Sequence, residues 1–196
     1  MKKLFVLIAT AIMSMGAMAQ VQFGAKVGFD LTNFWGKNIE HGMKPSYQAG
    51  LVMEYKFNPN FAIAPEVVFA SQGGKFKVVD MSLFGIDISK KVTFNTNYIN
   101  VPVMFKYYAT PEFSVDFGPQ VGFNVYSKYT IEDMKAIDIK DGTKAVDFGL
   151  GLGGTFNITD NAFVQARYTL GLTHVFDIDE DKTKNGNVQI AFGMKF

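Results

Sequence analysis

Residues 21–31 read Val-Gln-Phe-Gly-Ala-Lys-Val-Gly-Phe-Asp-Leu, with an apolar side chain at every odd position and a polar residue or glycine at every even one. Side chains of a β-strand point alternately to opposite faces, so this period of two predicts a strand with one apolar and one polar face. The pattern recurs in residues 47–57, 61–70, 99–107, 113–125, 146–156, 164–173 and 187–196, and no helical period is convincing. The chain is therefore predicted to be all-β, with eight strands.

The connections between these strands alternate in length. Asn58-Pro59-Asn60, Thr110-Pro111 and Thr159-Asp160-Asn161 consist of residues that favour tight turns. The other connections are longer polar segments near residues 33–45, 72–95, 128–143 and 175–186. Short turns at one end and long loops at the other are typical of an outer-membrane barrel, whose turns are periplasmic and whose loops are extracellular.

A soluble β-sandwich is the alternative fold, because it also buries one face of each strand. Strands of about ten residues have the length that a tilted membrane strand requires, which favours the barrel. The glycine-rich charged face suits a narrow interior, and the chain ends on a strand whose last residue is Phe196. We therefore predict an eight-stranded antiparallel up-and-down transmembrane β-barrel, and we expect Phe196 to act as an assembly signal.

The first nineteen residues have the features of a secretory signal peptide. Lys2 and Lys3 precede an apolar segment, residues 4–12, and Ala17-Met18-Ala19 is a small-residue cleavage site. A membrane helix would need about 20 apolar residues, and this segment has about half of that. We expect cleavage before Gln20, which leaves residues 20–196 as an outer-membrane β-barrel domain.

Composition excludes several classes of function. The chain has 19 basic and 18 acidic residues, so it lacks the positive surplus of a nucleic-acid-binding protein. It has no cysteine, which excludes disulfides, a lipoprotein anchor, thiolate zinc sites and cysteine nucleophiles. His41 and His174 are the two histidines, and neither belongs to a recognisable nucleophile–base set. We expect no catalytic residue, cofactor or metal site.

A family resemblance is carried by residues 98–107, Tyr-Ile-Asn-Val-Pro-Val-Met-Phe-Lys-Tyr. This stretch resembles the fourth-strand signature of the PorT-like outer-membrane β-barrel family of Bacteroidetes. Residues 23–28, Phe-Gly-Ala-Lys-Val-Gly, are similar to the opening motif of that family. The resemblance spans the mature chain and implies an eight-stranded barrel. Members differ in role, and one is linked to protein secretion across the outer membrane.

Ten charged residues fall on the polar face and are expected to point into the lumen: Lys26, Asp30, Glu54, Lys56, Glu66, Lys106, Asp116, Asp147, Arg167 and Lys195. Five are basic and five acidic, which indicates a paired network, because unpaired buried charge is costly. Arg167 is expected to reach Asp147, Asp116 or Glu66. Since eight strands leave a lumen just wide enough for side chains to fill, a side-chain plug is favoured over a conducting pore.

Two motifs that resemble ligand sites have structural interpretations. Residues 149–154 match G-x-G-x-x-G, but no helix follows to present its N-terminus to a phosphate. The glycines are expected to make room for Arg167 and Gln120. Residues 177–181 carry aspartate at every second position, as a calcium-binding loop does. Lys182 stands where such a loop needs glycine, so this segment is interpreted as a solvated acidic loop.

The connection between the third and fourth strands contains the most informative loop. Alternation around residues 75–78 and 91–94 predicts that these strands extend beyond the bilayer. The tip carries the surface-contact candidates Met81, Leu83, Phe84, Ile86 and Ile88. An apolar tip marks a contact site, or it folds back onto other loops.

The leading hypothesis is a non-enzymatic outer-membrane barrel that acts through its surface loops, in binding, adhesion or envelope stabilisation. The alternatives are an accessory component of a secretion machinery, which the family resemblance implies, and a small channel. Expected partners are outer-membrane lipid, the barrel-assembly machinery and an extracellular or secretion-system protein, with no nucleic acid.

Overall fold

The computed structural model describes residues 21–35, 41–83, 86–131, 137–138, 144–174 and 184–196. The proposed signal peptide and residues 177–181 lie outside these ranges. Side chains are described within them except at 34–35, 41–42, 74–83, 86–94, 129–131, 137–138 and 174. The strands are β1 Val21–Trp35, β2 His41–Gly42, β3 Lys44–Asn58, β4 Phe61–Leu83, β5 Ile86–Tyr108, β6 Phe113–Ile131, β7 Ile137–Asp138, β8 Val146–Asn157, β9 Ala162–His174 and β10 Lys184–Lys195.

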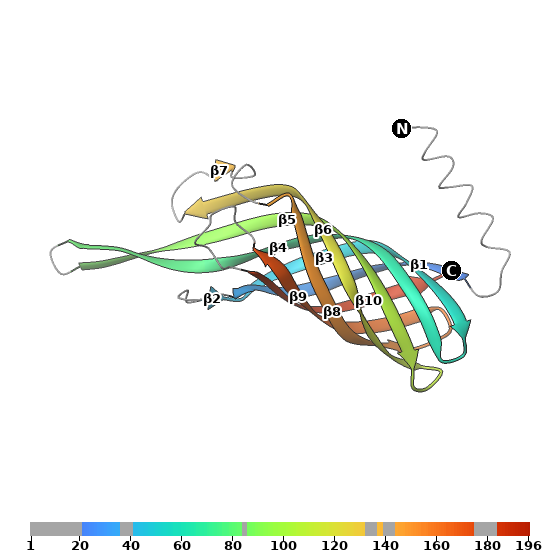
Figure 1. Cartoon of the computed structure of the whole chain (residues 1–196). Helices are drawn as coiled ribbons and strands as arrows, with labels where there is room; N and C mark the ends of the chain where they lie inside the picture. The colour runs from blue at the N-terminus through green and yellow to red at the C-terminus, as the bar shows by residue number, and fades with distance from the viewer. Residues whose placement is uncertain (1–20, 36–40, 84–85, 132–136, 139–143, 175–183) are drawn as a thin grey trace.

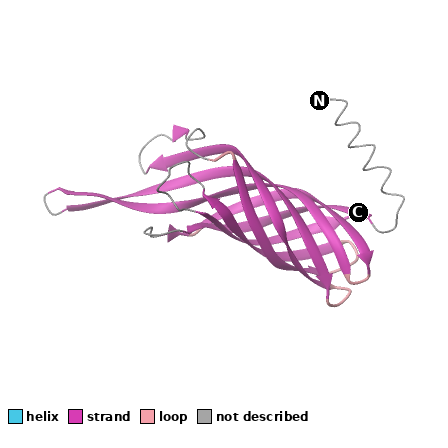
Figure 2. Cartoon of the chain, in the orientation of Figure 1, coloured by secondary structure: helices cyan, strands magenta, loops and turns pink. Residues whose placement is uncertain are grey.

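Eight long strands form a closed antiparallel barrel, which confirms the predicted fold (Figure 1). Each long strand pairs with its neighbours in sequence, in the order β1, β3, β4, β5, β6, β8, β9 and β10. The ring closes because β1 pairs with β10 from Gly24↔Lys195 to Trp35↔Lys184. β2 and β7 are two-residue strands beside β4 and β6. None of the described ranges contains a helix long and apolar enough to cross a membrane (Figure 2).

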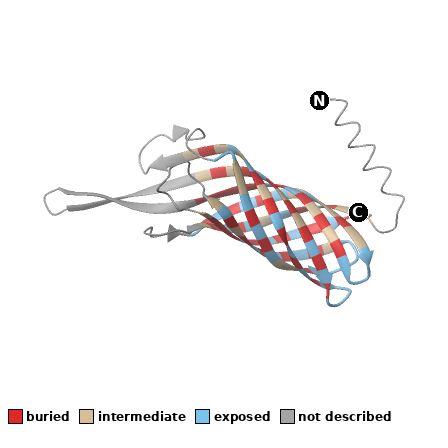
Figure 3. Cartoon of the chain, viewed as in Figure 1, coloured by how far each residue is buried: buried red, intermediate tan, exposed pale blue. Residues whose placement is uncertain are grey.

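Burial in this barrel is the reverse of that in a soluble protein. Large apolar side chains on the outward face are exposed, including Phe29 at 79%, Leu51 at 64% and Leu152 at 62%. Charged side chains of the inward face are buried, including Lys26 at 2% and Asp30 at 1%. Buried and exposed residues therefore alternate as a chequerboard around the wall (Figure 3). An apolar exterior around a polar lumen suits a barrel surrounded by lipid.

One end of the barrel, the turn end, carries the three tight turns and the C-terminus. Side chains stabilise these turns: Asn58 Oδ1 accepts from the amides of Asn60 and Phe61, and Thr159 Oγ1 accepts from those of Asn161 and Ala162. These are hydrogen bonds that turn-favouring residues commonly make to the backbone nearby. The sequence therefore located this end of the barrel correctly.

Backbone hydrogen bonds tie the turns to the strands beside them. The amides of Tyr108 and Asn157 donate to the carbonyls of Asn60 and Glu112, at 2.8 and 2.7 Å. The Phe196 amide donates to the Phe23 carbonyl at 2.7 Å, while its side chain is 79% exposed. The last residue thus continues the seam that closes the barrel.

The opposite end, the loop end, is uneven because β4 and β5 have 23 residues each, against 12 or 13 in β8, β9 and β10. The predicted extension of β4 and β5 around residues 75–78 and 91–94 is confirmed, and the pairing continues to Leu83↔Ile86, into the segment expected to form the tip. Beyond Phe76↔Val92 the two strands project as a ribbon (Figure 1), defined here as residues 77–83 and 86–91. Gly73 lies beyond the last pair between β3 and β4, Gln48↔Ala70, and has φ 137°, a conformation that glycine adopts readily.

Closure of the barrel predicts heat-dependent migration in SDS gels. Each of the eight long strands is hydrogen-bonded to a neighbour on both sides, so SDS finds no strand edge from which to open the sheet. The unheated chain should therefore migrate as a compact band, and boiling should convert it to the position of an unfolded chain of the same mass. Identical migration before and after boiling would contradict a closed barrel.

Candidate functional site

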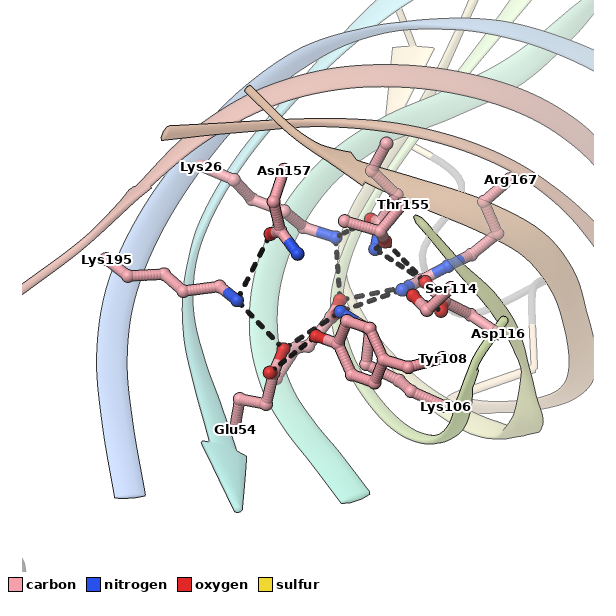
Figure 4. Close-up of polar contacts among 12 residues, drawn as sticks. Lys26, Glu54, Lys106, Tyr108, Ser114, Asp116, Thr155, Asn157, Arg167 and Lys195 are labelled. Atoms are coloured by element: carbon pink, nitrogen blue, oxygen red, sulfur yellow. Dashed lines mark hydrogen bonds and ion pairs between the residues drawn. The ribbon is translucent and has the colours of Figure 1, made fainter. Parts of the chain in front are cut away.

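The lumen contains most of the charged residues whose side chains the structure describes. The alternating pattern assigns each residue to the inward or the outward face, an assignment called parity below. Eight of the ten charged residues that parity placed inside are buried: Lys26, Asp30, Glu54, Glu66, Lys106, Asp116, Arg167 and Lys195. Lys56 and Asp147 are of intermediate burial and lie toward opposite ends of the barrel. Figure 4 shows how the side chains nearer the turn end converge.

Glu66 on β4 is the centre of the middle cluster. Arg167 donates from Nη2 to Oε1 at 2.7 Å and from Nη1 to Oε2 at 3.0 Å, while Lys26 Nζ donates to Oε2 at 2.6 Å. In the ring of eight strands, β9 stands directly opposite β4. The Arg167–Glu66 pair is therefore a bridge across the full width of the lumen, and bidentate pairing of this kind is among the strongest that side chains form.

Glu54 on β3 is the centre of a second cluster nearer the turn end. Its Oε2 accepts from Lys106 Nζ at 2.9 Å and from Lys195 Nζ at 3.2 Å, and its Oε1 accepts from the Tyr108 hydroxyl at 2.6 Å. Lys106 and Lys195 stand on β5 and β10, each two strands away from β3 in the ring. This cluster also connects non-adjacent strands.

The sequence predicted a paired network of lumen charges, and the ion pairs of that network are made by the two glutamates. Four cations form ion pairs with two glutamates, and the aspartates bind neutral donors instead. Asp116 accepts from Ser114, Thr155 and Gln165, Asp30 accepts from Gln48 and Asn187, and Asp147 accepts from Thr173 and Asn185. Each glutamate meets two long basic side chains, whereas hydroxyl and amide side chains already occupy the oxygens of the aspartates.

Arg167 was expected to reach Asp147, Asp116 or Glu66, and these contacts show which of the three is its partner. Glu66 is its ion-pair partner, while Asp116 and Asp147 are held by the donors of the wall. Lys56 forms no ion pair in the described ranges, and its Nζ lies 4.5 Å from the centre of the Tyr108 ring.

Glycines on β8 give Arg167 its space, as the sequence indicated. A Cβ at Gly151 would lie 3.4 Å from Arg167 Cδ and 3.2 Å from Met104 Cε. A Cβ at Gly153 would overlap the backbone carbonyl of Ala166, which is not free to move. Gln120 is not among the atoms nearest to these two glycines. The G-x-G-x-x-G match thus belongs to lumen packing.

Sequence reasoning missed the aromatic residues that point inward. Tyr98, Tyr108 and Phe163 are buried, and the Phe163 ring fills the space in front of Gly193. Parity could have found Tyr108, because it lies two residues after Lys106. Parity could likewise have found Phe163, two residues before Gln165, but apolar side chains inside the barrel were not expected.

Between the Glu54 and Glu66 clusters, the void bounded by described residues has a volume of about 10 Å³. That volume holds about one water molecule. The described residues contain no group of three or more metal-binding side chains. The arrangement fills and cross-links the lumen around the two glutamates.

The surface-contact candidates are less fully described than the lumen. Met81, Leu83, Ile86 and Ile88 belong to the paired ends of β4 and β5, but their side chains lie outside the description, and Phe84 lies outside the described residues.

Comparisons with known proteins agree with this geometry. A family model described as outer membrane protein beta-barrel domain matches residues 16–177. The structure of Ail, the attachment invasion locus protein of Yersinia pestis, superposes with a TM-score of 0.53 at 14% identity, covering 91% of this chain and all of that one. Neisserial surface protein A gives a TM-score of 0.57 at 11% identity, over 89% and 97% of the two chains. At these identities the two structures show the fold alone. No curated protein matches the chain.

The Glu66 cluster predicts an order of destabilisation. Glu66→Gln leaves Lys26 and Arg167 without their carboxylate and should cost on the order of 3–5 kcal/mol of unfolding free energy. Arg167→Met should cost less, about 1.5–3 kcal/mol, because Lys26 still neutralises Glu66. Denaturant unfolding in lipid vesicles measures both values.

The control is Lys144→Met, which removes an exposed cation at the loop end and should leave stability unchanged. Channel recordings of the same variants should show no current through a filled lumen. Unchanged stability of Glu66→Gln together with altered ion selectivity would contradict the plug.

Proposed function

The chain belongs to the family of outer membrane protein beta-barrel domains, and from this premise we propose that it is a non-enzymatic protein that binds an extracellular partner through its loop end. Membership of this family places the chain in the bacterial outer membrane. The barrel is the membrane anchor, and the ribbon is the binding element.

The single observation that carries this proposal is the bridge between Arg167 and Glu66. It crosses the lumen between opposite strands, and the neighbouring void is too small for solvent to pass. A filled lumen leaves the ends of the barrel as the places where the protein meets other molecules. This favours surface binding over the channel alternative.

The ribbon has the form of a recognition element. Among the described residues, β2 pairs with β4 as far as Phe76, and β6 pairs with β5 as far as Val92. Beyond those residues, β4 and β5 pair with each other alone in the described ranges. Each then offers backbone donors and acceptors to an added strand. We propose Met81, Leu83, Phe84, Ile86 and Ile88 as the side chains that contact the partner.

Shortening the ribbon tests this role. Phe76 and Val92 are paired across the hairpin, so an Asn-Gly turn in place of residues 77–91 should keep the register and the barrel. A strain that carries this variant should lose surface adhesion but retain normal secretion and detergent resistance. A second strain, with serine at the five contact positions, keeps the ribbon and should show the same loss.

The same two strains separate the alternatives. Loss of secretion would favour the accessory role that the PorT-like resemblance implies, and detergent sensitivity alone would favour envelope stabilisation. Normal adhesion by the shortened variant, with its heat-dependent gel shift intact, would refute binding through the ribbon.

Export and assembly complete the proposal. We propose that residues 1–19 are removed during export, that the turn end faces the periplasm, and that the assembly machinery recognises Phe196 at the closing seam. Deleting Phe196 removes the amide bonded to Phe23 and an exposed aromatic ring, so less chain should reach the membrane in folded form. The fraction of chain with a heat-dependent gel shift measures this, and a fraction equal to that of the intact chain would exclude the role. Phe196→Tyr keeps both features and is the matched control.

A further inference from the structure

The turn end contains a cavity that the proposed function does not use. Its volume is about 420 Å³, which is within the range of about 300–1,000 Å³ for small-molecule sites. The lining comes from six parts of the barrel: the starts or ends of β1, β3, β8 and β10, and the turns after β5 and β8. Gln22, Lys56, Asn157 and Lys195 supply its polar groups inside the barrel, and Glu112 and Asp160 stand on the turns at its edge.

Two lysines share a single glutamate at the inner side of this cavity. Lys106 and Lys195 both donate to Glu54, whose second oxygen is occupied by the Tyr108 hydroxyl. Asp116, the next carboxylate inward, accepts from Ser114, Thr155 and Gln165 and does not line the cavity. Both nearby carboxylates are therefore already engaged.

Lys56 is a third lysine at this end of the barrel, and neither Glu54 nor Asp116 forms an ion pair with it. It lines the cavity, its Nζ lies over the Tyr108 ring, and it has no ion-pair partner in the described part of the chain. Glu112 and Asp160 are exposed turn residues, and neither forms an ion pair with Lys56 or Lys195. An ammonium group has three donors and binds oxyanions through charge-assisted hydrogen bonds.

We propose that the turn-end cavity binds a soluble molecule through a phosphate or carboxylate group, with Lys56 as the main contact and Lys195 beside it. The anion replaces the missing carboxylate partner of Lys56, and the volume of the cavity accepts a molecule larger than the anion itself. The lining turns enclose the site within the lumen mouth, so the anion arrives from the aqueous side of the turn end and not from a lipid headgroup. This inference does not depend on the binding role of the ribbon.

Titration with inorganic phosphate tests the site. The full barrel is held in an uncharged maltoside detergent, and chloride is exchanged for phosphate at constant ionic strength. Amide chemical shifts of Lys56, Asn157 and Asp160 should change saturably, while those of the loop end should not. Lys56→Gln should weaken phosphate binding by about fivefold or more, because the charged donor is lost.

Two matched variants separate charge from folding. Lys56→Arg keeps the charge and should bind phosphate as the unmodified chain does, and Lys144→Gln removes a cation from the opposite end and should change nothing. Each variant must retain the heat-dependent gel shift to count. Equal responses to chloride and phosphate, or undiminished phosphate binding by a folded Lys56→Gln barrel, would overturn the proposal.

A separate experiment tests whether a lipid headgroup supplies the anion. Nanodiscs with and without phosphatidylglycerol are compared in phosphate-free buffer. Identical cavity shifts in the two preparations would support the soluble source. Shifts that require phosphatidylglycerol, without a response to phosphate in detergent, would refute it.

Discussion

A bidentate ion pair that crosses the lumen is the interaction on which the rest of this structure depends. Eight strands enclose a space so narrow that inward side chains must fill it. Arg167 and Glu66 meet there from opposite strands, and both are nearly inaccessible to solvent. The glycines of β8, the engagement of Lys26 and the small void beside the cluster all follow from accommodating this pair. Because the pair is buried, salt in the surrounding solution screens it only weakly.

Alternation in the sequence was sufficient to predict the barrel and the face on which each lumen residue lies. Lys26, Glu66 and Arg167 follow from parity alone, because each is flanked by outward apolar residues. Parity gives the face of a strand but not the height of a residue relative to a strand across the ring. That height depends on the stagger of all intervening pairs, so the choice of Glu66 over Asp116 as the partner of Arg167 required the structure. The same limit explains why the sequence could not show that the glutamates form the ion pairs while the aspartates accept from neutral donors.

The sequence predicts the turn end of the barrel more completely than the loop end. Asn58 and Thr159 belong to short segments whose residues hydrogen-bond locally, so the turn end could be recognised directly. Alternation predicted the strand extensions around residues 75–78 and 91–94, whereas the continuation of pairing to Leu83↔Ile86 at the tip required the structure. The turn-end cavity could not be predicted, because its lining comes from strands and turns that meet only after closure.

Cross-lumen pairing also makes the mechanical resistance of the barrel depend on which end of the chain is pulled. The C-terminal hairpin, β9 and β10, carries Arg167 and Lys195, one partner for each glutamate. Extracting that hairpin from the membrane by force must break both contacts in one event, together with the seam to β1. Extracting the N-terminal hairpin, β1 and β3, must break the same seam and the pairs of Lys26 with Glu66 and of Glu54 with Lys106 and Lys195. Extraction from the N-terminal side therefore breaks more ion pairs, but it leaves the Arg167–Glu66 bridge in place.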